Sequence, residues 1–272
     1  MSERAQYRMI TTAPARSGVP GRIIRGFLNA NRRGSGWIER HLPQARRDPF
    51  ELYDQAVCSC LNRLSSPLIA DIGGGRSCSF VSAARRHSGS RIVAVDISAE
   101  ELRHNNDVDE KRQADVAQEL PFSDGEVDLL VSRTVLEHVR NVEAFIALST
   151  RVVSERGYVV HLVPCRYAPF AVIGRLLPFE FARSILHFLR PESIGVVEFP
   201  VYYDKCNNSA FNAALNRHGF ELVDAKFSYY QSNYYDAFLP AYCLSALYEI
   251  LIQLLDCRDL AAYMVIVARK TA

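Results

Sequence analysis

Apolar runs of strand length alternate with segments of helical spacing through the middle of this 272-residue chain. Short continuous apolar runs are typical of strands buried on both faces, and apolar residues three or four positions apart are typical of helices packed on a sheet. The alternation predicts a doubly wound α/β fold, with helices on both faces of a mostly parallel sheet. The predicted strands lie at 68–71, 91–96, 127–132 and 157–163, and the predicted helices between them at 77–86, 99–105 and 137–154.

A helix that covers the first strand is predicted to begin the folded domain. Asp48 is a suitable N-cap, Pro49 suits the first helical position, and Glu51 lies three residues after the cap. The apolar side chains that follow fall at helical spacing and form one stripe. They are Leu52, Tyr53, Ala56, Val57, Cys60 and Leu64.

The first predicted strand ends in Asp71 and a turn made of Gly73 to Gly75. Glycines allow positive φ and let the backbone approach a ligand closely, so this turn predicts a site for a nucleotide-like cofactor. The predicted helix over 77–86 would add exposed backbone N–H groups beside it. Asp96 ends the next apolar run, about 20 residues further on, where an acid can accept hydrogen bonds from ribose hydroxyls.

Two details separate a nucleoside-type site from a dinucleotide site. The dinucleotide fingerprint has a third glycine that lets the helix pack closely on the strand, and Cys78 stands at that place. Asp71 would repel a pyrophosphate, whereas it suits a ligand that carries a positive amino group.

Further motifs follow in a defined order. Asp115 precedes Leu120-Pro121-Phe122, Asp128 lies in the third predicted strand, and Leu136-Glu137-His138-Val139 follows that strand. Together with the Asp71 turn and Asp96, these motifs resemble those of the class I S-adenosylmethionine-dependent methyltransferases, in particular the branch that includes small-molecule and quinone methyltransferases. The resemblance covers residues 65–165.

This resemblance implies a Rossmann-like, doubly wound sheet of seven strands, mostly parallel with the last strand antiparallel, and helical insertions. It also implies S-adenosyl-L-methionine as the cofactor. The methionine end would lie against Asp71 and the glycine turn, and the ribose against Asp96. The adenine would meet Asp115 and the Val116 backbone, with Ser132 beneath the methyl group. The implied cofactor-binding residues are Asp71, Gly73, Gly74, Gly75, Asp96, Ile97, Asp115, Val116 and Ser132.

Beyond the resemblance, a helix is predicted over 207–217 and strands over 220–229 and 261–269, with two insertions between these elements. The first insertion, 165–198, is rich in Phe, Leu and Arg. The second, 231–258, carries a helix that is apolar around most of its circumference. Two interpretations stay open: the second insertion is buried against the first, or the two form a hydrophobic cap for a lipid-linked substrate. The second insertion has one polar stripe, Ser245, Glu249, Gln253 and Asp256.

Methyl transfer from a sulfonium is an in-line displacement, so alignment and the exclusion of water matter more than catalytic side chains. If the acceptor is a hydroxyl, a general base helps by removing its proton. The candidate bases are His138 and His161, with Asp204 as a third, and each also has a structural interpretation. Tyrosines of the C-terminal half could line an acceptor pocket or be ordinary sheet residues. These are Tyr202, Tyr203, Tyr229, Tyr230, Tyr234 and Tyr235.

Charge divides the chain into a basic N-terminal arm, 1–47, and a methyltransferase domain, 48–272. Residues 1–50 hold ten Lys/Arg and three Asp/Glu. The mixture of apolar and basic residues over 21–33 suits a membrane interface, while a solvated tail, a phosphate contact and a transit segment remain alternatives. The first twenty residues lack the apolar core of a secretory signal. We therefore expect a cytoplasmic protein, with peripheral membrane contact through the arm and the insertions left open.

Several classes of function are disfavoured. The seven cysteines are scattered, and the pair Cys58 and Cys60 has no second pair at zinc-site spacing, so neither a disulfide framework nor a metal is expected. No interleaved aromatic and basic pattern suggests nucleic acid. The leading prediction is methylation, at oxygen, of a small-molecule, saccharide (glycan) or lipid-linked acceptor. The alternatives are a catalytically silent subunit of the same fold and a nicotinamide-dependent oxidoreductase.

Overall fold

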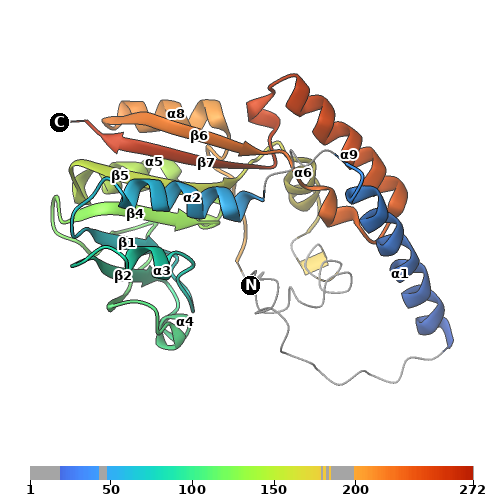
Figure 1. Cartoon of the computed structure of the whole chain (residues 1–272), viewed down its shortest axis with the longest axis horizontal. Helices are drawn as coiled ribbons and strands as arrows, with labels where there is room; N and C mark the ends of the chain where they lie inside the picture. Colours follow the sequence, from blue (N-terminus) through green and yellow to red (C-terminus); the bar gives the residue numbers. More distant parts are fainter. Residues whose placement is uncertain (1–18, 43–47, 179, 182–183, 185–198, 272) are drawn as a thin grey trace.

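The computed structural model describes residues 19–42, 48–178, 180–181, 184 and 199–271. In this part of the chain seven strands form one sheet in the order β3-β2-β1-β4-β5-β7-β6, and β7 runs antiparallel to both of its neighbours. The other pairs are parallel, so the predicted mostly parallel sheet with an antiparallel last strand is confirmed (Figure 1). The strands are β1 Leu68–Ile72, β2 Arg91–Asp96, β3 Glu110–Gln113, β4 Val127–Arg133, β5 Val153–Pro164, β6 Phe220–Ser228 and β7 Tyr263–Lys270.

Helices cover both faces of the sheet, and a further group lies at the edge toward which β4 runs (Figure 1). That edge carries the carboxyl ends of the parallel strands, where α/β folds bind their ligands. The helices at this edge are α1 Val19–Glu39, α6 Pro169–Leu176 and α9 Leu239–Leu254. Those that cover the sheet are α2 Pro49–Leu61, α3 Val81–Ala84, α4 Ala99–His104, α5 Val142–Val152 and α8 Asn208–Arg217, and the short 3-10 helices are η2 Leu136–His138, η4 Ser232–Tyr235 and η5 Arg258–Leu260.

Each central strand sends alternate side chains into two separate cores. Ile69 of β1 packs with the α2 stripe, which includes Tyr53 and Val57. The next residue, Ala70, packs on the opposite face with Phe145 of α5 and Phe211 of α8. Because successive side chains of a strand point to opposite faces, a strand covered by helices on both sides has to be apolar throughout. This explains why the apolar runs predicted the strands well.

The predicted start of α2 is confirmed in its details. Asp48 has extended backbone angles, its carboxylate accepts a hydrogen bond from the Phe50 N–H at 2.8 Å, and Pro49 occupies the first turn. The apolar stripe of this helix is buried as expected, except that Leu64 lies beyond the helix end and is partly exposed.

Three predictions of secondary structure were wrong. Of the helix predicted over 77–86, only Val81–Ala84 is helical, because side chains hold the preceding segment: Asp107 accepts from the Cys78 N–H at 2.9 Å. A four-residue helix has little dipole, so it adds no anion site beside the glycine turn. The helix predicted over 137–154 is divided into η2 and α5, since Asn141 caps a new start at Val142. The edge strand β3 was not predicted, because its sequence is entirely polar.

Helix α1 occupies residues that the sequence described only as a basic arm. It packs on the start of α9: Asn31 Oδ1 accepts a hydrogen bond from the Leu239 N–H at 2.8 Å, and Ser35 Oγ donates to the Asp236 carbonyl at 3.0 Å. Tyr230 adds a hydrogen bond to Glu39 at 2.7 Å. The described part of the arm therefore packs on the second insertion, and the division of the chain at residue 47 stays a prediction.

Candidate functional site

The glycine turn that follows β1 can be built only from glycines. Gly73 and Gly75 have positive φ, +71° and +44°, which is the left-handed region that side chains disfavour. A Cβ at Gly73 would come within 2.2 Å of Val135 Cγ2, and one at Gly74 within 2.8 Å of Ala94 Cβ. The turn is fixed to β2 by the Gly73 N–H, which donates to the Val95 carbonyl at 2.7 Å. The result is a backbone cradle at the carboxyl edge of the sheet.

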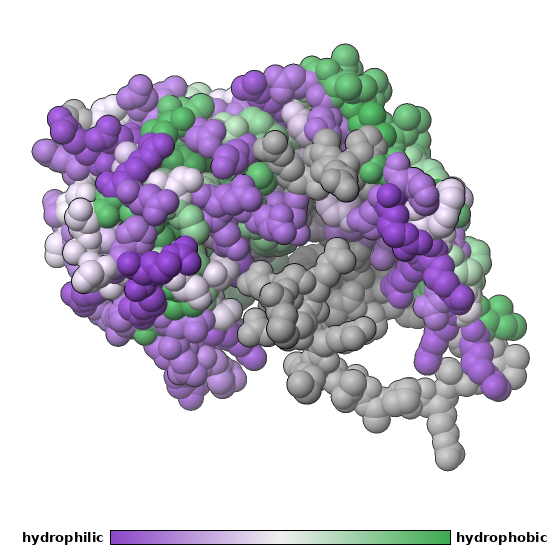
Figure 2. Space-filling view, viewed as in Figure 1, coloured by the Kyte–Doolittle hydropathy of each residue, from purple (hydrophilic) through white to green (hydrophobic). Residues whose placement is uncertain are grey.

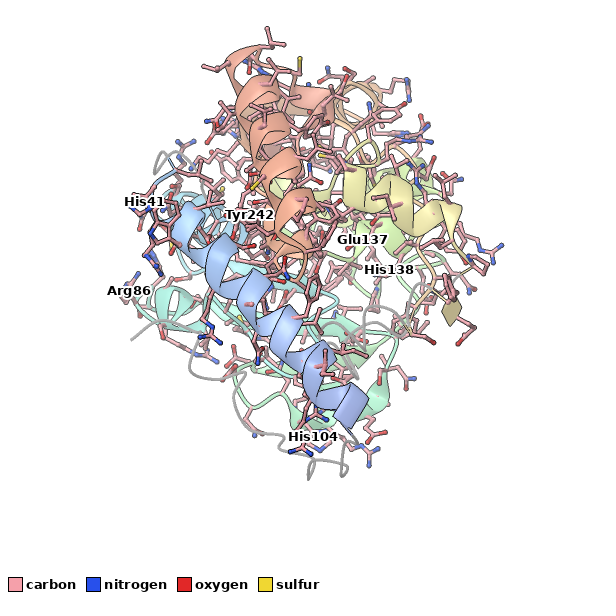
Figure 3. The ribbon with its side chains drawn as sticks, turned by 90° about the vertical axis from the view of Figure 1, so that its right-hand side faces the viewer. His41, Arg86, His104, Glu137, His138 and Tyr242 are labelled. Atoms are coloured by element: carbon pink, nitrogen blue, oxygen red, sulfur yellow. The ribbon has the colours of Figure 1, made fainter. Side chains whose placement is uncertain are left out.

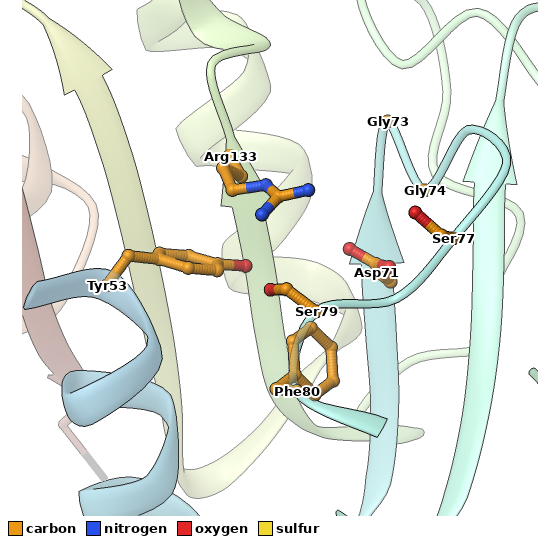
Figure 4. Close-up of a pocket in the computed structure, with 8 residues that line it drawn as sticks. All are labelled: Tyr53, Asp71, Gly73, Gly74, Ser77, Ser79, Phe80 and Arg133. Carbon is orange, nitrogen blue, oxygen red and sulfur yellow. The ribbon is translucent and has the colours of Figure 1, made fainter. Parts of the chain in front are cut away.

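A small cavity opens beside this cradle, with about 230 Å³ of empty space including its mouth. Side chains from α2, β1 and the end of β4 converge on it, and Figure 4 shows the Tyr53 hydroxyl and the Arg133 guanidinium both directed toward Asp71. The cavity is small, so it suits a polar group at one end of a ligand and not a whole ligand. It is lined by Tyr53, Asp71, Gly73, Gly74, Ser77, Ser79, Phe80 and Arg133.

Asp71 carries the chemistry of the cavity. Its side chain is buried at the tip of β1, and burial raises its pKa to about 7, although the positive charge of Arg133 opposes the rise. A buried carboxyl of this kind gains most from a ligand that brings a positive group and hydrogen-bond donors.

Two further side chains of the cavity are ready to bind a ligand. The Tyr53 hydroxyl is buried and has no hydrogen-bond partner among the described residues. Burial and the neighbouring Asp71 charge both raise the pKa of Tyr53, so its hydroxyl keeps its proton and can donate it. Arg133 lies at the end of β4 with its guanidinium carbon 5.8 Å from the centre of the Phe50 ring. A buried hydroxyl without a partner is costly, and a polar ligand would satisfy it.

The next predicted residues lie along the same edge. Asp96, at the end of β2, accepts hydrogen bonds from the Gly75 N–H at 3.1 Å and the Ser98 N–H at 2.8 Å. Each carboxylate oxygen keeps a lone pair for a further donor. Ile97, the residue after β2, exposes 51% of its surface. Asp115 and Val116 are half-buried, and Asp115 accepts from the Ala117 N–H at 3.0 Å.

Two predicted site residues lie away from this edge. Ser132 and His161 are register partners on β4 and β5, buried to 0% and 1% exposure, with Ser132 Oγ 2.8 Å from His161 Nδ1. Their side chains point into the helix layer, where His161 stands edge-on to Phe145 and Phe211. Burial lowers the His161 pKa to about 3. Neither side chain is part of the cavity lining, so the roles of Ser132 and His161 stay predictions.

The other candidate base, His138, lies in η2 with its side chain one-third exposed. Its Nδ1 is 3.0 Å from the Pro200 carbonyl, and burial lowers its pKa. The third candidate, Asp204, accepts a hydrogen bond from the Val142 N–H at 2.9 Å and so caps the start of α5.

Sequence reasoning missed Tyr53, Ser79 and Arg133 as cavity residues and Glu137 as a buried acid. The apolar stripe places Tyr53 on the buried face of α2, which is correct, but a hydrophobic pattern does not show that its hydroxyl reaches the cavity. Arg133 follows an apolar run directly, and a charged residue at the end of a buried strand is a signal that could have indicated the edge of the sheet.

Comparison with known proteins adds to this geometry. Residues 70–161 match the family model described as "Methyltransferase domain", which spans the glycine turn, Asp96, Asp115 and η2. Among curated proteins, none matches the sequence of the chain.

Solved structures match about four fifths of the chain. One is geranyl diphosphate C-methyltransferase from Streptomyces coelicolor A3(2), in complex with Mg²⁺, geranyl diphosphate and S-adenosyl-L-homocysteine. It matches with TM-score 0.55 and 16% identity, over 81% of this chain and 79% of that chain. The [4+2]-cyclase SpnF matches with TM-score 0.53 and 15% identity, over 82% and 80% of the two chains. An S-adenosylmethionine-dependent methyltransferase from Mesorhizobium loti matches with TM-score 0.51 and 17% identity, over 79% and 98%. At these identities the matches establish the fold alone.

The residues of the cavity fit the implied cofactor. A buried carboxyl, a guanidinium and an unpaired hydroxyl complement the amino and carboxylate groups of an amino acid, and the glycine turn leaves room for a ligand backbone to pass. These features favour the methyltransferase over the oxidoreductase that the sequence left open. Residues 70–161 match a methyltransferase domain, and the seven-stranded sheet around them has the fold seen in S-adenosylmethionine-dependent methyltransferases.

Proposed function

We propose that the Asp71 cavity holds the methionine end of S-adenosyl-L-methionine. Asp71 would pair with the amino group, while Arg133 and the Tyr53 hydroxyl would bind the carboxylate. The observation that carries this assignment is the meeting of a buried carboxyl, a guanidinium and an unpaired hydroxyl in one cavity. Ser77 and Ser79 line the same cavity and would add hydroxyl groups.

The rest of the cofactor would follow the carboxyl edge of the sheet. Asp96 would accept hydrogen bonds from the ribose hydroxyls. The exposed Ile97 side chain would pack on the adenine, and Asp115 with the Val116 backbone would contact the rim of that ring. The distance from Asp71 to Asp96 is bridged by the glycine turn itself, because the Gly75 N–H already donates to Asp96.

Asp96→Ala tests this part of the assignment. The loss of charge-assisted ribose hydrogen bonds should cost about 1.5 to 3 kcal/mol of binding free energy. Titration calorimetry measures the loss, and an unchanged affinity would refute the ribose assignment.

The bound cofactor supplies a methyl group on a positively charged sulfur that is a good leaving group. The protein has to hold the acceptor in line with that group and keep water out. We propose that the acceptor is a small molecule or saccharide and that it is methylated on a hydroxyl oxygen.

An aromatic cluster near the cavity supports this acceptor class. The Phe170 ring lies 4.7 Å from the Tyr234 ring and 5.7 Å from the Tyr263 ring, both nearly parallel to it. The hydroxyls of Tyr234 and Tyr263 are 2.5 Å apart. Phe50 connects the cluster to Arg133, since its ring lies 6.5 Å from Tyr263 and below the guanidinium. Aromatic faces with hydroxyl tips suit sugars and planar rings.

Two measurements test the proposed function. Calorimetry should show that S-adenosyl-L-methionine binds and that a nicotinamide dinucleotide does not; the reverse result would contradict the proposal. Mass spectrometry of products formed from fractionated extract with isotope-labelled cofactor should show a methyl ether. Methyl groups found on nitrogen or carbon would contradict O-methylation alone.

We also propose that the α9 side of the molecule contacts an anionic lipid surface, which would suit a lipid-linked acceptor. Leu244, Leu247, Leu251 and Leu254 on α9 are 54–80% exposed, and Figure 2 shows this apolar surface at the upper right. Exposed arginines on the neighbouring helix α1 and its end supply the complementary charge. They are Arg22, Arg25, Arg33 and Arg40. In the described parts of the chain every helix is too short or too polar to span a bilayer.

Vesicle sedimentation tests the lipid contact. The protein should bind vesicles that contain phosphatidylserine, and Leu247→Glu with Leu251→Glu should abolish binding. Ser59→Glu, on the outer side of α2, is a control with added charge away from α9. Equal sedimentation of the α9 variant and the wild type would refute the contact.

A further inference from the structure

Glu137 is a buried acid beside the glycine turn. It lies in η2 (Figure 3), shortly after β4, and the residue is 5% exposed. Val135, two residues earlier, fills the space against Gly73, so η2 packs on the cofactor cradle. The backbone around Glu137 is held in unusual conformations: Thr134 and Tyr203 both have positive φ. Strain of this kind persists where the surrounding structure fixes it, often at functional sites.

The carboxyl of Glu137 has an unused oxygen. Oε2 is buried and has no hydrogen-bond partner among the described residues. Oε1 lies 3.9 Å from His138 Nε2, which is too far for a hydrogen bond. The backbone of the same residue is satisfied, because its carbonyl accepts from the N–H groups of Tyr202 and Tyr203 at 2.7 and 3.1 Å. The backbone N–H of Glu137 itself offsets part of the cost of burying this carboxyl. A buried carboxyl oxygen without a partner is still costly, so Oε2 calls for a ligand.

The titratable groups around Glu137 are neutral near pH 7. Burial raises the pKa values of Tyr203, Tyr263 and Cys206, and the Glu137 charge adds to each rise. Burial lowers the pKa of His138. Burial also raises the pKa of Glu137 itself to about 8, and no charged group offsets it. The Arg175 guanidinium carbon lies 5.5 Å from the centre of the Tyr203 ring.

We propose that Glu137 Oε2 is the proton acceptor for the acceptor hydroxyl, an inference that rests on the proposed function. As the acceptor oxygen bonds to the methyl carbon, the bonding pair of the carbon–sulfur bond stays on sulfur. The hydroxyl proton moves to Glu137 Oε2. A cationic sulfur and a carboxylate thus become a neutral sulfide and a carboxylic acid, and the charges balance.

Glu137 can accept a proton only after it has lost its own, and it is mostly protonated at neutral pH without a ligand. A positive charge nearby is therefore needed to lower its pKa. An opposite charge within about 4–6 Å lowers a carboxyl pKa by roughly 1–3 units. The sulfonium of the bound cofactor would supply such a charge, and the neutral sulfur of S-adenosyl-L-homocysteine would not. The two ligands are otherwise alike, and both would place the same amino group beside Asp71.

Proton release on binding tests the inference without a known acceptor. Calorimetry of both ligands in buffers of different ionisation enthalpy, at about pH 7.5, gives the number of protons released. With a shift of about one unit, S-adenosyl-L-methionine should release about half a proton more than S-adenosyl-L-homocysteine. Equal release by the two ligands in the wild-type protein would overturn the inference.

Two variants identify the group. Glu137→Gln keeps the shape of the side chain and should abolish the difference between the ligands while both still bind. His138→Asn, which keeps a donor for the Pro200 carbonyl, should leave the difference unchanged. A difference that survives in Glu137→Gln, or is lost in His138→Asn, would overturn the inference. If neither ligand binds the wild-type protein, the proposed function fails and the inference fails with it.

Discussion

Asp71 and Glu137 are two buried acids that follow neighbouring strands, yet their surroundings differ. Asp71 ends β1 beside a cavity and a guanidinium, and burial raises its pKa to about 7 against the effect of Arg133. Glu137 follows β4 among tyrosines, and its pKa rises to about 8 with no charged group to oppose the rise. The first environment suits an acid that holds a positive group permanently. The second suits an acid that takes up and releases a proton.

Removal of the Asp71 charge should have the largest effect. In Asp71→Asn the amino group of the cofactor would be buried beside Arg133 without its partner, which costs about 3 kcal/mol or more. Cofactor affinity should fall about 100-fold or more by calorimetry. Glu137→Gln is the matched control, with a loss of only a few fold. Equal losses in the two variants would remove the distinction between the acids.

The pH dependence of stability compares the acids without any ligand. Each pKa is raised in the folded state above its ordinary value, which is 3.8 for Asp71 and 4.5 for Glu137. The folded protein therefore binds more protons than the unfolded chain between about pH 4 and 8. Stability is therefore lost as pH rises through this window. Glu137→Gln should raise the free energy of unfolding at pH 8, relative to pH 5, by on the order of 3 kcal/mol.

Urea denaturation at the two pH values measures this gain. Asp71→Asn should give a smaller gain that is complete by about pH 8, because Arg133 already offsets part of the cost. Identical pH profiles for the wild type and both variants would show that neither acid is held in its protonated form.

Tyr53→Phe should have the smallest effect on binding and separates function from folding. The Tyr53 hydroxyl has no partner in the described structure, so its removal should leave stability unchanged or slightly raised. Cofactor affinity should fall by about 1 kcal/mol, or roughly fivefold, because one hydrogen bond to the ligand carboxylate is lost. Thermal denaturation with and without cofactor checks both. A variant that is destabilised without cofactor would indicate a structural role instead.

The sequence predicted the central strands because both of their faces are buried. β1, β2 and β4 follow the apolar runs to within a residue or two, and α2 follows its N-cap. β3 has alternating exposure but only polar side chains, so hydrophobic patterning could not find it. The predicted site residues that follow a strand lie at the carboxyl edge of the sheet, because parallel strands all end at that edge.

Sequence patterns could not show the direction of side chains. Ser132 was expected beneath the methyl group, but it still belongs to β4, and its side chain points into the helix layer with His161. The polar stripe of α9 is a second example, because the pattern left its direction open. Ser245 and Glu249 face inward, where Glu249 accepts from the Gln231 N–H at 3.0 Å and from the Ser232 N–H, and leucines face outward.

The outward leucines of α9 also bear on the interpretation that the second insertion is buried against the first. The described part of 165–198 contacts the second insertion through Phe170, which stacks on Tyr234, and not through the leucine face of α9. Most of the first insertion after 178 lies outside the described residues. Periodicity cannot show which face of a largely apolar helix is buried. Here the buried face is set by one acid that accepts hydrogen bonds from the backbone of a neighbouring turn.

A crystal structure of the protein with S-adenosyl-L-homocysteine tests the central claim most directly. The ligand's amino group should lie within hydrogen-bond distance of Asp71, about 3 Å, with its carboxylate on Arg133 and Tyr53 and its ribose hydroxyls on Asp96. Its sulfur should face η2 and Glu137. A ligand bound with its adenine in the Asp71 cavity, or bound away from the glycine turn, would contradict the account.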